Sequence, residues 1–196
     1  MSTQREKTRD FWREHHPKPY FHFPDIPASE RLNFAYFDEK NAWELHKLVK
    51  DEINPFIPED YKDPERFAEY IKDTEVFGAY SPKHSFCEWL IYTKEQEACI
   101  GVVGLYELSL ETFNDNHRKC NVGIVIGEKY RKNYYALEAI NQLVTYAHQE
   151  LDMNKLVAYM KKNNEVSKQL FRKLGFLDNT EAYYYADKYD YFERKL

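Results

Sequence analysis

Three cations stand where an apolar run meets the start of a long amphipathic segment. The turn 127–133 follows the apolar run 122–126 and carries Lys129, Arg131 and Lys132. The first amides of a helix have no intrahelical acceptor, and the helix dipole places partial positive charge there. A strand, a basic turn and a helix start in succession therefore form a site for a phosphate group. The pattern leaves a second interpretation open, because a basic turn is often only solvated surface.

A polar pair, Asn164 and Ser167, stands before another stretch with helical spacing. Asn163 or Asn164 is predicted to cap this helix, since an asparagine side chain accepts a hydrogen bond from an amide of the first turn. Gly175 is predicted to end it. The expected inward stripe consists of Val166, Leu170, Phe171 and Leu174.

The rest of the pattern supplies the elements that must position these residues. Apolar runs predict strands at 32–36, 86–92, 98–106, 120–126, 155–160 and 183–195, with 86–92 and 98–106 joined as a hairpin by the charged turn 94–97.

A helix capped by Asp38 and ended by Pro55 and Pro58 follows the first strand. Its expected stripe is Ala42, Leu45, Val49 and Ile53. Asp63 and Pro64 begin a second helix, which buries Phe67, Tyr70 and Ile71. A third helix runs from about Ala136 to Glu150.

Length and composition indicate one soluble domain. The chain has 196 residues, 43% of them hydrophobic, and a net charge of -5 from 28 basic and 33 acidic side chains, which argues against nucleic acid as a partner. No run approaches the roughly 18 apolar residues of a membrane span, and the N-terminus lacks the apolar core of a signal peptide. We expect a cytoplasmic protein without membrane contact. Cys87, Cys99 and Cys120 lie far apart, which predicts buried thiols rather than disulfides.

Two runs of sequence make the chain similar to a known family. The first extends from Val122 through Arg131 to Ala139, and the second from Asn164 to Phe176. On these runs the sequence resembles the GNAT acetyltransferases, and among them the branch of ribosomal-protein alanine acetyltransferases RimJ and RimL with their polyamine-acetylating relatives. The resemblance covers about residues 31–196 and leaves 1–30 as an irregular arm rich in aromatic residues and prolines. It implies the α/β (α+β) GNAT fold, with a mixed central sheet of about six to seven strands flanked by about four helices.

The same resemblance implies a binding site for acetyl-CoA as co-substrate. The turn matches the family's pyrophosphate loop R-x-x-G-x-G/A, with Arg131 and Ala136 in the matching places. The residues of this loop are Arg131, Lys132, Asn133, Tyr134, Tyr135 and Ala136. Ile124, Val125 and Ile126 would bind the pantetheine arm through their main chain and offer an amide to the thioester carbonyl. Asn164 and Ser167 match positions on the far side of the coenzyme channel. Helix capping is the alternative role for this pair, and one residue can serve in both.

Four residues depart from the family pattern. Lys132 and Tyr134 replace loop glycines, and a side chain at Tyr134 obstructs the phosphates unless its ring points away. Asn121 stands where relatives often carry a glutamate base, and an amide cannot take a proton. Phe171 replaces the tyrosine that many GNAT enzymes outside this branch use to protonate the leaving thiolate. It fits the apolar stripe, and we predict that it packs in the core.

No catalytic residue emerges from the sequence. His117, Glu107 and Glu111 are candidate bases, although each also suits an exposed surface. Tyr183, Tyr184 and Tyr185 with Tyr189 and Tyr191 either line an acceptor pocket or fill a strand, and we favour the strand. His15, His16 and His22 have no Cys or acidic partner at ligand spacing, so no metal site is predicted.

The resulting hypothesis is an N-acetyltransferase that moves an acetyl group directly from acetyl-CoA to a primary amine: a protein N-terminus, a polyamine or a small amine. The alternative is a GNAT-fold binding or regulatory module with weakened or lost catalysis, which Asn121 and Tyr134 favour. An acyl group larger than acetyl is a third possibility. The proline-rich arm suggests a possible homodimer.

Overall fold

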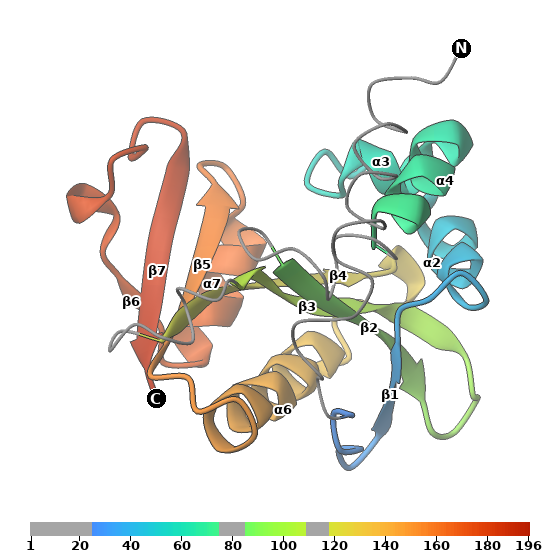
Figure 1. Ribbon diagram of the computed structural model, residues 1–196. Helices are drawn as coiled ribbons and strands as arrows, with labels where there is room; N and C mark the ends of the chain where they lie inside the picture. Colours follow the sequence, from blue (N-terminus) through green and yellow to red (C-terminus); the bar gives the residue numbers. More distant parts are fainter. Residues whose placement is uncertain (1–24, 75–84, 109–117) are drawn as a thin grey trace, which may run out of the picture.

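The computed structural model describes residues 25–74, 85–108 and 118–196, which build a seven-stranded mixed sheet with helices on both faces (Figure 1). The strands are β1 (Leu32–Tyr36), β2 (Ser85–Thr93), β3 (Cys99–Leu108), β4 (Lys119–Ile126), β5 (Lys155–Lys161), β6 (Leu177–Asp178) and β7 (Tyr189–Lys195). The helices are α2 (Ala42–Val49), α3 (Glu59–Lys62), α4 (Pro64–Asp73), α6 (Tyr135–Gln149) and α7 (Glu165–Lys173). The strand order is β1-β2-β3-β4-β5-β7-β6. This is the predicted mixed α/β architecture.

The sheet divides between β4 and β5. These two strands are parallel, because the crossover helix α6 connects them, and they are paired only from Lys119 opposite Lys155 to Asn121 opposite Val157. Beyond Asn121, β4 continues beside β3, whereas β5 continues beside β7. The two strands therefore diverge, and Figure 1 shows β5 and β7 turning away from the rest of the sheet.

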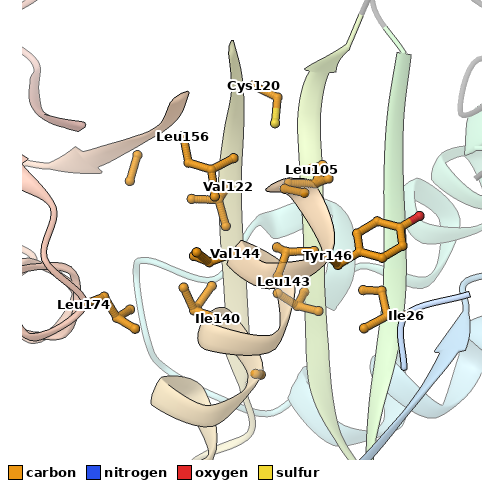
Figure 2. Close-up of a cluster of buried hydrophobic side chains, with 14 of the residues drawn as sticks. Ile26, Leu105, Cys120, Val122, Ile140, Leu143, Val144, Tyr146, Leu156 and Leu174 are labelled. Carbon is orange, nitrogen blue, oxygen red and sulfur yellow. The ribbon is translucent and has the colours of Figure 1, made fainter. Parts of the chain in front are cut away.

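The larger core lies between the sheet and α6 (Figure 2). Ile140, Leu143 and Val144 of α6 face Leu105 of β3 and Val122 of β4. These side chains are at most 7% exposed, and burying one of this size stabilises the fold by about 1.5–3 kcal/mol. The helix is thus held against the strand that precedes it, which fixes where its first turn lies.

A second core lies on the opposite face, under α2, α3 and α4. Phe37 and Phe67 meet edge to face with ring centroids 6.2 Å apart. The predicted start of α4 is confirmed: the amide of Arg66 donates to Asp63 at 2.8 Å, and Pro64 occupies the first helical position.

Three details of the predicted helices are wrong. Helix α2 ends at Val49, before the prolines, and Ile53 is 95% exposed beyond its end. Asp38 does not cap α2 directly, because its carboxylate accepts from the amides of Lys40 and Asn41 in the preceding turn. In α7, Val166 is 80% exposed, since the helix is covered only along the stripe that contains Phe171. Periodicity identifies the helices but extends their apolar faces too far.

The end of the chain also differs from the prediction of one strand at 183–195. Strand β7 begins at Tyr189, and Tyr183–Tyr185 lie in the turns before it. Tyr183 stacks on Tyr191 with centroids 5.0 Å apart, while Tyr184 is 88% exposed. The tyrosines 183–185 have high β propensity, but the pairing of β7 with β5 extends only from Tyr189 to Lys195 and leaves them outside the strand.

Cys87 and Cys120 are buried, as predicted, and Cys99 is half-buried; all three are free thiols. Of the N-terminal arm, only 25–30 belong to the described residues. Ile26 is buried in the larger core there, and the arm's aromatic residues lie outside the described ranges.

Candidate functional site

The start of α6 presents backbone amides that no side chain of the described residues caps. Its N-cap residue, Tyr134, makes no capping hydrogen bond, and the helical ladder begins with the amide of Glu138 donating to the carbonyl of Tyr134. The amides of 135–137 precede that first bond. By contrast, α4 and α7 are capped by the side chains of Asp63 and Asn164. A helix of 15 residues therefore directs its positive dipole end, and amides without an acceptor among the described residues, out of the turn, as an anion site requires.

The glycine positions of the loop have a conformational explanation. Lys132 and Tyr134 adopt left-handed backbone conformations, with φ of 65° and 63°. Glycine takes this conformation freely, whereas other residues lose about 1–2 kcal/mol in it. The Tyr134 side chain is 68% exposed, and no ring contact among the described residues holds it. The structure therefore places the ring outside the packed turn.

A buried carboxylate braces the turn from the side of α2. The side chain of Glu52 is 7% exposed, accepts from the amide of Glu128 at 2.6 Å and pairs with the guanidinium of Arg131. Arg131 also donates from Nε to the carbonyl of Ile126 at 2.9 Å. Arg131 thus ties the turn to β4 and to Glu52. Of the three predicted cations, Lys129 and Lys132 are exposed, and the ammonium group of Lys129 lies 4.7 Å from the ring centre of Tyr130.

A second brace holds the turn from the side of β1. Arg31 donates from its amide and from Nε to Glu138, each at 2.7 Å, and from its guanidinium to the carbonyl of Asn133 at 3.1 Å. Its guanidinium also lies 4.7 Å from the ring centre of Tyr135. Desolvation raises the pKa of Glu138, but hydrogen bonds from Ser29 and Arg31 outweigh it and leave the pKa below its ordinary value. The carboxylate nearest the helix start is therefore neutralised by Arg31.

An open strand edge leads from this turn into the sheet. Residues 122–126 of β4 pair with β3 on one side, and on the other side their pairing with β5 has ended at Asn121. Ile124 and Val125 are half-buried and Ile126 is buried. Because the chain passes directly from Ile126 into the turn, the strand residues and loop residues named from the sequence form one continuous backbone surface.

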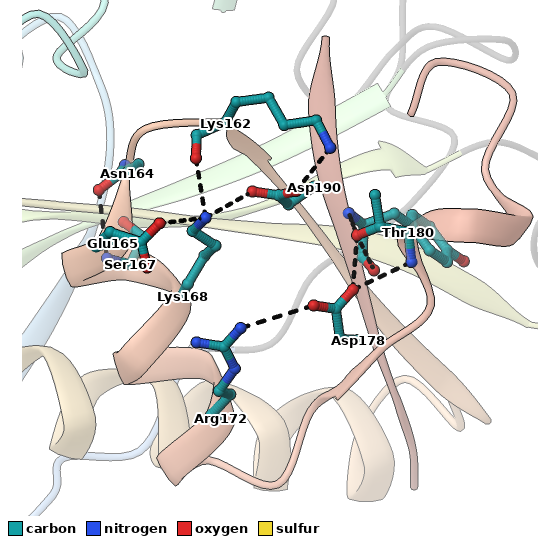
Figure 3. Close-up of polar contacts among 10 residues, drawn as sticks. Lys162, Asn164, Glu165, Ser167, Lys168, Arg172, Asp178, Thr180 and Asp190 are labelled. Carbon is teal, nitrogen blue, oxygen red and sulfur yellow. Dashed lines mark hydrogen bonds and ion pairs between the residues drawn. The ribbon is translucent and has the colours of Figure 1, made fainter. Parts of the chain in front are cut away.

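Asn164 and Ser167 lie across the divergence, on the helix that follows β5. The amide of Ser167 donates to Oδ1 of Asn164 at 3.3 Å, which confirms the capping role (Figure 3). In the same region Asp190 pairs with Lys162 at 2.9 Å and with Lys168 at 3.0 Å. Desolvation raises the pKa of Asp190, and these two lysines more than compensate and lower it. This network fixes β7 against the start of α7.

Only some of the residues considered for catalysis from the sequence lie among the described residues. Asn121 is half-buried at the last rung between β4 and β5, and its Oδ1 has no hydrogen-bond partner among them. Glu107 is exposed and accepts from the hydroxyl of Tyr159 at 3.4 Å. His117 and Glu111 lie outside the described residues. Phe171 packs against Phe176 at 5.0 Å between ring centroids, so its role in the core is confirmed.

A buried acid on β2, the strand on the other side of β3 from β4, was not predicted from the sequence. Glu88 of β2 is 1% exposed, and one of its oxygens accepts from the hydroxyls of Tyr106 at 2.6 Å and Tyr61 at 2.7 Å. Burial raises the pKa of Glu88, and hydrogen bonds from Tyr106, Tyr61 and Tyr70 offset part of the rise. The available signal was a lone charge inside the apolar strand 86–92. Arg31, Glu52 and Glu138 carried no comparable local signal.

No cluster of His, Cys, Asp and Glu among the described residues could hold a metal ion, and His15, His16 and His22 lie outside them. Within 25–74, 85–108 and 118–196, no helix has both the length and the apolar character that crossing a membrane requires.

Comparison with known proteins gives consistent matches. The family model of the acetyltransferase (GNAT) domain matches residues 31–177. An uncharacterized N-acetyltransferase, YoaA of Bacillus subtilis (strain 168), is 26% identical over 155 residues, which are 79% of this chain and 83% of that protein.

Two solved structures illustrate the shared fold. The RimL ribosomal L7/L12 alpha-N-protein acetyltransferase in complex with coenzyme A superimposes with a TM-score of 0.69 at 18% identity, over 88% of this chain and 98% of that one. A spermidine N-acetyltransferase SpeG chimera from Vibrio cholerae and hSSAT superimposes with a TM-score of 0.63 at 18% identity, over 85% of this chain and 94% of that one.

Proposed function

This chain belongs to the GNAT acetyltransferase family, and we propose that it transfers an acetyl group from acetyl-CoA to a primary amine. The observation that carries the proposal is the uncapped start of α6 beside the open edge of β4. One surface of this backbone suits a diphosphate, and the adjoining one suits an extended amide-containing arm. These are the two parts of coenzyme A that precede the thioester.

The residues present fit such a molecule. The amides of 135–137 and the exposed Lys132 would hold the pyrophosphate, while Arg31 and Glu52 keep the turn in place. The left-handed conformations at Lys132 and Tyr134 allow the loop to form without glycine, at an energetic cost that the surrounding contacts offset. Main-chain groups of Ile124 to Ile126 would bind the pantetheine arm, and Asn164 and Ser167 would face it from α7.

The reaction needs three things from the protein: a proton must leave the amine, the tetrahedral oxyanion needs a donor, and the thiolate must be released. A strand amide near Ile124 to Ile126 is a fixed donor for the oxyanion. Holding both substrates along one strand edge supplies rate through proximity. No covalent enzyme intermediate is required, in keeping with the apolar side chains of this part of β4.

We extend the proposal to the acceptor by analogy with proteins of the same fold. RimL is named as an acetyltransferase of a protein N-terminus and SpeG as one of spermidine. Both acceptors react through a primary amine. We propose that this chain belongs to the RimJ/RimL branch on the basis of its similarity in fold to these proteins. The protein would act in the cytoplasm, where acetyl-CoA and these amines occur together.

A binding module without catalysis is the second candidate, because Asn121 cannot accept a proton. Titration calorimetry with coenzyme A, together with thiol release from acetyl-CoA and longer acyl-CoAs in the presence of peptides, polyamines and small amines, separates the two. Coenzyme binding with turnover supports the enzyme. Binding without turnover for any amine supports the module, and absence of coenzyme binding refutes acetyl transfer.

The arm 1–28 is proposed to mediate a homodimer. Removing residues 1–28 and measuring the mass in solution tests this: the full chain should have the mass of a dimer and the truncated protein that of a monomer. A monomeric mass for both proteins would contradict it.

A further inference from the structure

The buried acid at Glu88 has an unusual environment for a carboxylate. It is 1% exposed, its Oε2 has no hydrogen-bond partner among the described residues, and none of their ion pairs includes it. The titratable groups that face it are phenols from three elements: Tyr61 of α3, Tyr70 of α4 and Tyr106 of β3. A carboxylate in such a place costs stability when ionised.

One of these phenols connects Glu88 to the point where β4 and β5 diverge. Tyr61 is 4% exposed, whereas Tyr106 is half-buried. Tyr106 lies opposite Asn121, which is on the last rung paired with β5. The Tyr106 side chain therefore extends from this rung to Glu88, to which its hydroxyl donates at 2.6 Å.

Two glycines make room for this path. Gly104 is paired with Glu88 on one side and with Gly123 on the other. A Cβ at Gly104 would lie 2.7 Å from the hydroxyl of Tyr106, and one at Gly123 would lie 2.9 Å from its ring. The ring thus lies across both glycines, over the strand that is proposed to hold the thioester.

We propose that Glu88 takes the proton of the acceptor amine through Tyr106, so that Tyr106 contacts the amine and Glu88 is a positioning residue behind it. This inference rests on the proposed acetyl transfer. It accounts for the lack of a proton-accepting side chain at Asn121, because the carboxylate that takes the proton belongs to β2 rather than to β4.

The proton steps balance. The ammonium group gives a proton to the oxygen of Tyr106 while the hydroxyl proton of Tyr106 moves to Oε1 of Glu88, which leaves a neutral amine and a neutral buried acid. The amine nitrogen then forms a bond to the thioester carbonyl carbon, the carbon–sulfur bond breaks, and the second nitrogen proton neutralises the leaving thiolate. Glu88 returns its proton to solvent by the reverse path.

The electrostatics of the cluster suit this direction of transfer. Burial raises the pKa of Glu88, so the carboxylate is a stronger base than an exposed glutamate. Burial and the charge of Glu88 also raise the pKa of Tyr106 well above its ordinary value, so the phenol stays protonated and can relay. The base works only when ionised, hence kcat/KM should rise with pH through the raised pKa of Glu88.

The test compares three variants on the amine that the full-length wild type turns over. Glu88→Gln and Tyr106→Phe are each expected to lower kcat about 100-fold, to leave KM for acetyl-CoA unchanged and to remove the low-pH limb of kcat/KM. Tyr61→Phe is the matched control, because it removes the other hydrogen bond to the same oxygen away from the path. Tyr61→Phe should keep the low-pH limb of kcat/KM but move it to higher pH. The hydrogen bond from Tyr61 lowers the pKa of Glu88, and its loss should raise that pKa.

A stability measurement gives a readout that needs no turnover. The folded state with a raised Glu88 pKa binds its proton more tightly than the unfolded chain. The free energy of unfolding of wild type minus that of Glu88→Gln should therefore fall as pH rises above the ordinary pKa of a glutamate. A difference that is flat with pH overturns the proposal.

The outcomes separate the two levels of inference. Wild-type turnover with an unchanged low-pH limb in Tyr106→Phe refutes the relay and leaves acetyl transfer standing. Loss of the limb in Tyr61→Phe as well as in Tyr106→Phe also refutes it, since the path would then not be specific. Wild type that binds coenzyme A but turns over no amine refutes the proposed function itself, and the relay with it.

Discussion

Replacing Glu52 by alanine tests whether the turn before α6 depends on a carboxylate from another part of the chain. The change deletes the acceptor for the amide of Glu128, which is bonded at 2.6 Å, and the partner of Arg131. Glu128 is exposed, so water can replace the lost acceptor of its amide, and the loss of this hydrogen bond costs about 0.5–1.5 kcal/mol. The lost ion pair adds about 0.5–1 kcal/mol, because the Arg131 side chain is 33% exposed and water replaces part of the interaction.

The total loss is therefore about 1–2.5 kcal/mol. In a chain of 196 residues each kcal/mol lowers Tm by roughly 2–4 °C, so Tm should fall by about 2–10 °C. Without Glu52 the turn is less ordered, so coenzyme A must order it again on binding, at a cost of about 1 kcal/mol per residue. This cost exceeds the gain in binding from freeing the guanidinium of Arg131, which is partly exposed to water. The Kd for coenzyme A should rise about fivefold to tenfold.

Chemical denaturation and titration calorimetry measure both quantities. Asp51→Ala is the matched control, because the neighbouring carboxylate is 89% exposed and its nearest cation, Lys50, is 3.7 Å away. It should change stability by less than about 0.5 kcal/mol. Equal losses in the two variants, or an unchanged Kd for Glu52→Ala, would show that the brace does not hold the coenzyme site.

The remaining predictions concern the loop, the strand and the far side of the channel. Tyr134→Gly should leave the Kd for coenzyme A within about threefold, because the exposed ring is not packed into the turn; calorimetry showing more than tenfold tighter binding would mean that the ring blocks the phosphates. Gly123→Ala should displace the ring of Tyr106, 2.9 Å from the new methyl group, and lower kcat more than it raises KM for acetyl-CoA; unaltered kinetics would exclude that contact. Asn164→Ala should cost about 1 kcal/mol in denaturation, like Asp63→Ala in α4, and if Asn164 also contacts the coenzyme, only this variant should weaken binding.

Much of the fold could be predicted from local sequence. The Asp63–Pro64 start of α4, the Asn164 cap of α7 and the hairpin around 94–97 were recognised because each depends on hydrogen bonds or steric limits within a few residues. Gly175, with φ of 78°, marks the end of α7 for the same reason.

The limits of prediction appear where local periodicity does not reveal what covers a surface. Ile53 and Val166 have apolar side chains at helical spacing, yet both are exposed because no neighbouring element packs on them. Tyr183–Tyr185 have high strand propensity but lie in turns, since pairing with β5 selects Tyr189 as the start of β7.

Local signals in the chain thus specified the strand, basic turn and helix of the candidate site, together with the resemblance that assigns its family. The assembly of that site depended on contacts between distant positions: Glu52 with Arg131 across 79 residues, Arg31 with Glu138 across 107, and Glu88 with the phenols of three elements. Such contacts form only after folding brings the residues next to β1 and α2 to the turn and places β2 and β4 on either side of β3. Their energy depends on the burial and neighbours that folding creates, and a linear pattern carries neither.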